Sequence, residues 1–82
     1  MALNHSMDIM KADVYGRHMK AAEDGNYESA KECGKYFSLV DDLDNAIKYY
    51  ELYLRLTPFT DMFVKMEVKA LKAKRLKRSF FG

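Results

Sequence analysis

The sequence has few of the residues that mark disulfide frameworks, metal sites and chain reversals. Its 82 residues include one cysteine, Cys33, one proline and four glycines. A single cysteine excludes an intramolecular disulfide framework, and two histidines without a ligand cluster around them argue against structural zinc. The chain also lacks a glycine-rich phosphate loop. These absences favour a reducing setting, and we expect a cytoplasmic protein without a metal or another cofactor.

Long apolar runs are absent as well. None approaches the roughly 20 residues of a bilayer span, so no transmembrane segment is expected. Residues 1–11, MALNHSMDIMK, lack the basic and apolar regions of a secretory signal. Apolar residues make up 49% of the chain and charged residues 32%, which is typical of a globular domain. A chain this short buries only roughly 60–65% of the surface that its unfolded form exposes, so its core is thin.

Sparse glycine and proline, with no alternating strand pattern, predict an all-α fold. Residues 1–6 are expected to be flexible, and Ser6 is a candidate N-cap for a first helix that ends at Gly25. Asn26 can cap a second helix over residues 27–39. The small and aromatic residues of its predicted buried face are Ala30, Cys33, Gly34 and Phe37.

Two further helices follow. Either Asp41 or Asp42 can cap a third helix, which Pro58 ends. Its apolar residues recur at three- and four-residue steps: Leu43, Ala46, Ile47, Tyr50, Tyr53 and Leu54. Thr60 is a candidate cap for the fourth helix, with Phe59 and Val64 placed for a hydrophobic staple. The predicted stripe of this helix is Phe63, Met66, Ala70 and Ala73, with Val64, Val68 and Leu71 beside it.

These elements predict one domain over residues 1–82. We expect four short helices in antiparallel hairpins, arranged as a small bundle or a repeat-like stack. The basic residues 74–82 are expected to form a frayed tail that protrudes beyond the core. Because the core is thin, we also expect self-association, most simply as a homodimer through the third or fourth helix.

The second and third helices together resemble a tetratricopeptide repeat, a helical hairpin of about 34 residues. The matching positions are small residues, aromatic residues and the final proline: Ala30, Gly34, Phe37, Ala46, Tyr50 and Pro58. The turn departs from the pattern, since Asp41-Asp42 stands where Gly-Asp or Gly-Asn is usual, and Tyr53 occupies a usually small position. The resemblance covers about residues 30–58 and implies a stack of hairpins that binds other proteins.

Catalytic constellations are missing from the sequence. Cys33 lies on an apolar helix face, where a small buried thiol is expected rather than a reactive one. His18 follows the stripe of the first helix, and no partner residue is placed by spacing, so we interpret it as a histidine between helices. We therefore do not expect an enzyme.

Three tyrosines in five residues are the first candidate for a binding surface. Tyr50 and Tyr53 share the apolar face of the third helix, whereas Tyr49 is displaced by one position and is expected at the edge of that face. A tyrosine at such an edge serves equally as an interface residue or as boundary packing. The leading hypothesis is a non-catalytic adaptor or regulator that binds a partner protein through Tyr49, Tyr53 and neighbouring residues.

Charge asymmetry is the second candidate. Residues 1–64 hold seven Lys or Arg against eleven Asp or Glu, whereas residues 65–82 hold seven against one. This basic end could be a solvated helix terminus, or it could contact nucleic-acid phosphates, an acidic protein surface including that of a second copy, or an anionic membrane. The alternative function is thus a nucleic-acid-binding accessory protein. The candidate contact residues are Lys69, Lys72, Lys74, Arg75, Lys77 and Arg78.

Overall fold

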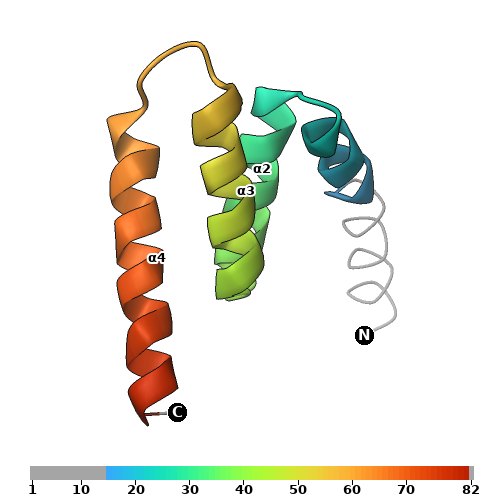
Figure 1. Cartoon of the computed structure of the whole chain (residues 1–82). Helices are drawn as coiled ribbons and strands as arrows, with labels where there is room; N and C mark the ends of the chain where they lie inside the picture. Colours follow the sequence, from blue (N-terminus) through green and yellow to red (C-terminus); the bar gives the residue numbers. More distant parts are fainter. Residues whose placement is uncertain (1–14, 82) are drawn as a thin grey trace, which may run out of the picture.

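The structure, a computed structural model, describes residues 15–81 (Figure 1). In this range all the regular elements are helices: residues 15–23, α2 (Tyr27–Leu39), α3 (Leu43–Leu56) and α4 (Met62–Phe81). The prediction of an all-α fold is confirmed, and the second and third helices have the predicted bounds. The predicted flexible residues 1–6 and the predicted helix start at Ser6 lie outside the described residues.

The two turns that precede α2 and α3 are built in the same way. After residues 15–23, the Asn26 N–H donates to the Ala21 carbonyl (2.9 Å) across Gly25, whose φ is 107°. After α2, the Asp42 N–H donates to the Phe37 carbonyl (2.9 Å) across Asp41, whose φ is 65°. Both are Schellman motifs, which need a left-handed residue just past the helix. Glycine provides that conformation in the first turn and an aspartate provides it in the second.

Side-chain caps start both helices. The Asn26 side chain accepts a hydrogen bond from the Ser29 N–H (3.1 Å), and the Asp42 side chain accepts one from the Asn45 N–H (3.3 Å). These caps satisfy N–H groups that have no partner inside the helix. α3 ends at Leu56 because Thr57 precedes Pro58 and is extended, with ψ 139°.

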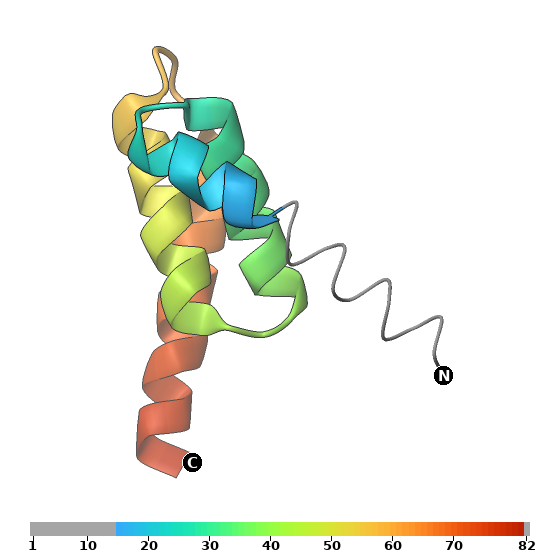
Figure 2. The same ribbon diagram turned by 90° about the vertical axis from the view of Figure 1, so that its right-hand side faces the viewer.

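α3 is the central helix. It runs antiparallel to both neighbours and packs against α2 on one side and α4 on the other, while residues 15–23 cover α2 and α3 at the end of the molecule far from α4 (Figures 1 and 2). The core is formed by buried side chains from all four segments: Ala22, Ala30, Cys33, Leu43, Ala46, Ile47, Tyr49, Tyr50, Tyr53, Val64, Val68 and Leu71. α2 and α3 coincide with the segment that resembles a tetratricopeptide repeat. Because many α folds contain such a hairpin, membership of that family stays a prediction.

Gly34 allows the closest approach of α2 and α3. A Cβ atom on Gly34 would lie 2.5 Å from Tyr50 Cδ1 and 2.7 Å from its Cγ. The ring of Tyr50 therefore occupies the space that a side chain at position 34 would need.

The fourth helix differs from its prediction at its start. Asp61, not Thr60, caps α4, since Asp61 Oδ1 accepts a hydrogen bond from the Val64 N–H (3.1 Å). The expected staple between Phe59 and Val64 is also wrong. Phe59 lies edge-on to the Tyr27 ring, with 6.0 Å between ring centroids. With Asp61 as the cap, the residue before the cap is Thr60 rather than Phe59, so Phe59 and Val64 do not hold the two staple positions.

The buried side of α4 is the second correction. Val64, Val68 and Leu71 face the core, whereas Phe63 and Met66, which lie on the predicted main stripe, are 88% and 65% exposed. Asp61 provides the reason, because it both caps α4 and accepts a hydrogen bond from the Tyr53 hydroxyl (2.6 Å). That bond ties the first turn of α4 to α3 and so sets which side of the helix faces the core.

The tail is the third correction. Residues 74–81 continue α4 as regular helix rather than fraying, although their side chains are exposed. α4 extends past the turn that joins α2 to α3 (Figures 1 and 2). The prediction that the basic end protrudes is confirmed, but it protrudes as an ordered helix.

Candidate functional site

The tyrosines chosen from the sequence as a binding surface are buried. Tyr49 is 0% exposed and Tyr53 is 1% exposed, so neither presents surface to a partner in this structure. Tyr49 was expected at the edge of α3, but its ring stacks on Phe37, with 5.6 Å between centroids, and its hydroxyl donates to Glu23 (3.3 Å). α3 is covered by residues 15–23 as well as by α2 and α4. Side chains are therefore buried around more of α3 than contact with a single helix would bury, and Tyr49 is among them.

Burial and nearby carboxylates raise the pKa of Tyr49 and of its neighbour Tyr50. The pKa of Tyr49 rises to about 12, first because of burial and then because of Glu23. The pKa of Tyr50 also rises to about 12, through burial and then through Glu67 and Glu32. Both phenols therefore stay neutral at physiological pH and act as packing groups with a polar tip.

A polar network joins α2, α3 and the start of α4. Asp61 Oδ2 accepts a hydrogen bond from the Tyr53 hydroxyl (2.6 Å) and lies 3.4 Å from Lys31 Nζ. Lys31 Nζ also lies 5.4 Å from the centre of the Tyr53 ring. The hydrogen bond from Tyr53, the Val64 N–H and Lys31 hold the pKa of Asp61 below its usual value. Asp61 is therefore ionised and stabilises the corner between α3 and α4.

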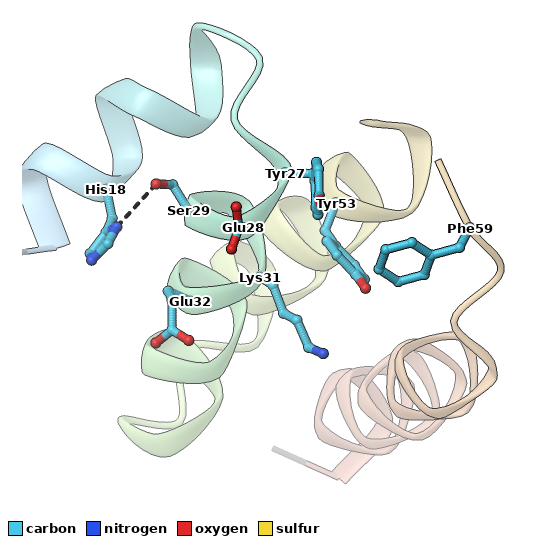
Figure 3. Close-up of a pocket in the computed structure, with 8 residues that line it drawn as sticks. All are labelled: His18, Tyr27, Glu28, Ser29, Lys31, Glu32, Tyr53 and Phe59. Atoms are coloured by element: carbon cyan, nitrogen blue, oxygen red, sulfur yellow. Dashed lines mark hydrogen bonds between the residues drawn. The ribbon is translucent and has the colours of Figure 1, made fainter. Parts of the chain in front are cut away.

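Beside this network lies an open groove of about 470 Å³ (Figure 3). Tyr27, Tyr53 and Phe59 line one end of it, and His18 and Ser29 lie at the other. His18 Nδ1 is 3.1 Å from Ser29 Oγ, within hydrogen-bond distance, and this contact joins residues 15–23 to α2. The position of His18 between helices is as expected from the sequence.

The histidine and serine do not form a catalytic arrangement among the described residues. A nucleophilic serine needs a base that a third group orients, and no carboxylate in residues 15–81 hydrogen-bonds to His18. Ser29 is also only 6% exposed. Within the same residues, no cluster of His, Cys, Asp or Glu side chains is placed to hold a metal ion.

Cys33 is a buried thiol on the face of α2 that meets α3. Burial, followed by the negative charges of Glu23 and Glu32, raises its pKa to about 11. A thiol with this pKa is protonated at physiological pH and is a poor nucleophile.

The basic residues of α4 meet acidic residues of the same chain. Lys74 Nζ and Arg78 Nη2 lie 3.2 Å and 2.6 Å from the carboxylate of Asp41. Arg75 pairs with Asp44 at 3.3 Å. In the middle of the helix, Lys72 pairs with Glu51 at 2.9 Å.

Four of the six predicted contact cations are thus already paired within the chain. Lys69 and Lys77 have no ion pair among the described residues. The pairs also explain why the tail is ordered, because they tie the last turns of α4 to the turn after α2 and to the start of α3. Sequence reasoning recognised the acidic and basic segments but did not place them against each other.

The side of α4 turned away from α3 is an exposed apolar surface. We call it the outer α4 face, and its residues are Met62, Phe63, Met66, Ala70, Ala73, Leu76, Lys77 and Phe80. Phe63 is 88% exposed, Met66 65% and Phe80 76%. Single exposed apolar residues are common on proteins, but several large ones on one side of a helix, here at both ends of a stretch of alanines, indicate a contact surface. The sequence contained the signal for this surface, since the apolar stripe of the fourth helix was identified but was not proposed as a binding surface.

Neither a candidate membrane span, within the described residues, nor a similar known protein is found. Within residues 15–81, none of the helices combines the length and the apolar character needed to cross a bilayer. No protein-family model matches the chain, and neither the curated proteins nor the solved structures contain a detectable match to it.

Proposed function

We propose that this chain is a small non-catalytic protein-interaction module, an adaptor or regulator, that binds through the outer α4 face. The observation that supports this most is the row of large apolar side chains exposed along a helix whose other side is packed on α3. Burying Phe63 and Met66 would each contribute about 1.5–3 kcal/mol to binding before the costs of association. The docking surface proposed here therefore replaces Tyr49 and Tyr53, which are buried.

Nucleic-acid binding by the same helix has weaker support. Phosphate contacts would have to replace the ion pairs that Lys72, Lys74, Arg75 and Arg78 make within the chain. Such exposed pairs are each worth only about 0.2–1 kcal/mol, so they lower the affinity for a polyanion without abolishing it. A log-log salt slope of several units with generic duplex DNA would support this alternative function.

Site-specific photocrosslinking in the native cell tests the proposed interaction module. A photoreactive residue in place of Met66 should give discrete protein adducts. The matched control is the same residue in place of Leu39, which is 85% exposed but lies at the end of α2. Adducts from position 66 that disappear with Phe63→Glu would support the proposal. Equal adducts from both positions, or none from position 66, would contradict it.

A further inference from the structure

The outer α4 face has the residue spacing of a coiled-coil seam. Phe63, Met66, Ala70, Ala73, Lys77 and Phe80 follow one another at steps of three, four, three, four and three residues. This is the heptad pattern in which the first and fourth positions meet a second helix. All six side chains are exposed, so the seam has no partner within residues 15–81.

Building on the proposed function, we infer that the partner at this surface is a second copy of the chain, whose α4 packs antiparallel to the first. The two-fold axis passes between residues 71 and 72, so Ala70 of one copy meets Ala73 of the other. The same register sets Phe63 against Phe80 at both ends of the seam and Met66 against Lys77 between them.

The sizes of the side chains fit this register. Small residues at the centre let two helix backbones approach closely. The aromatic ring at 63 lies seven residues before Ala70, and the ring at 80 lies seven residues after Ala73. A buried phenylalanine removes about 150–250 Å² from water. The four exposed rings of two copies thus supply about 500–800 Å², a large part of the roughly 1,200 Å² at which stable interfaces begin.

Charge favours the antiparallel orientation over the parallel one. A parallel pair would place Lys77 against Lys77 of the other copy inside the seam. An antiparallel pair places Lys77 opposite Met66 and next to Glu67, the single acidic residue of α4. Glu67 has no ion pair among the described residues, so the Glu67 of each copy is available to pair with Lys77 of the other.

The internal ion pairs make the approach of two basic helices less costly. Lys72, Lys74, Arg75 and Arg78 are neutralised by Asp41, Asp44 and Glu51 on the side that faces the body of the protein. Repulsion across the dimer then comes mainly from Lys65 and Lys69. α4 lies at the edge of the molecule with α3 on one side, so a second copy reaches the outer α4 face without meeting α2 or residues 15–23 (Figure 1).

A charge exchange between Glu67 and Lys77 tests the partner and the orientation together. Glu67→Lys and Lys77→Glu should each weaken dimerisation in sedimentation equilibrium, by roughly two- to thirtyfold for two symmetry-related pairs. The double variant should restore the wild-type Kd. Both residues are exposed, so circular dichroism should show unchanged folding in all three proteins. If the single variants weaken dimerisation but the double variant does not restore the wild-type Kd, the antiparallel arrangement is contradicted.

Disulfide trapping tests the register. An equal mixture of Ala70→Cys and Ala73→Cys chains should form the mixed disulfide dimer faster than either chain alone forms its own. The wild-type chain is the control, because its buried Cys33 should give no crosslink. Two Lys77→Cys residues would lie about 16 Å apart along the antiparallel seam but side by side in a parallel one. Rapid formation of the Lys77→Cys homodimer would therefore indicate a parallel pair and would overturn the inference.

Two results separate a failure of this inference from a failure of the proposed function. A chain that stays monomeric at high concentration, yet gives adducts of a different protein from position 66, retains the interaction module and excludes the second copy. A monomer that instead co-sediments with vesicles containing phosphatidylserine overturns both, because a membrane then covers the outer α4 face. If Met66→Glu abolishes dimerisation and Leu39→Glu does not, the result supports both the second copy as partner and the proposed function.

Discussion

Replacing Gly34 with alanine should destabilise the protein, although alanine is the better helix former. In an exposed helix interior this change would add about 1 kcal/mol to the free energy of unfolding. Here the new Cβ would lie 2.5 Å from Tyr50 Cδ1, where ordinary contacts begin at 3.4 Å. The Tyr50 Cγ atom, at 2.7 Å, is close to the backbone and cannot swing away freely. Overpacking of this kind costs about 1–3 kcal/mol. After the gain in helix propensity is deducted, we expect a net loss of up to about 2 kcal/mol.

Thermal unfolding followed by circular dichroism measures this effect. For a domain of this size, the Gly34→Ala variant should melt below the wild type, by up to about 15 °C. The same substitution at Gly16, where a Cβ would meet nothing within 4 Å, is the matched control and should not lower Tm.

The decisive comparison repeats Gly34→Ala in a Tyr50→Ala background. Without the ring, the clash is absent, and Gly34→Ala should then raise Tm. Sucrose can be added to all four proteins to keep the Tyr50→Ala chain folded at the start of the melt. If Gly34→Ala stabilised the wild type by about 1 kcal/mol, the close seating of Tyr50 on Gly34 would be refuted.

Two further predictions concern titratable groups. The pKa of Asp61 is lowered in the folded protein, so its ionised form stabilises the fold above the ordinary carboxyl value near pH 4, and this contribution is lost as the pH falls through the lower folded pKa. The Tm difference between wild type and Asp61→Asn should therefore be largest above pH 4 and should narrow below it; a difference independent of pH would contradict the role of the charge. Cys33, whose pKa is raised to about 11, should react with a thiol reagent at pH 8 only as fast as the protein opens. Rapid labelling of the folded chain would show that the thiol is accessible.

The sequence predicted the local elements better than their mutual orientation. Asn26, Gly25 and Asp42 act within a few residues of their own position, so the bounds of α2 and α3 followed from the caps and turns. Thr60 and Asp61 are adjacent and both can cap a helix, so the start of α4 was ambiguous by one residue. The hydrogen bond from Tyr53 to Asp61, which spans two helices, resolves that ambiguity and is invisible in the local pattern.

The candidate surface was misplaced because α4 carries two apolar stripes. The sequence analysis placed Phe63 and Met66 on the main stripe, with Val64 and Val68 beside it. Periodicity alone could not show which of the two stripes faces the core. Tyr49 was misplaced for a similar reason, since a single buried face was assumed for a helix that is covered on three sides. In both cases the missing information was the tertiary arrangement of helices distant in sequence.

Asp41 has a consequence for anyone who redesigns this chain. It occupies the left-handed turn position where glycine is usual, and it also holds Lys74 and Arg78 at the far end of α4. An engineer who replaced it with glycine to relax the backbone would release the last turns of the helix. Aspartate at position 41 thus makes the turn less favourable but holds the end of α4. Glycine there would stabilise the turn, and it would shorten the part of α4 that extends into solvent as an ordered helix.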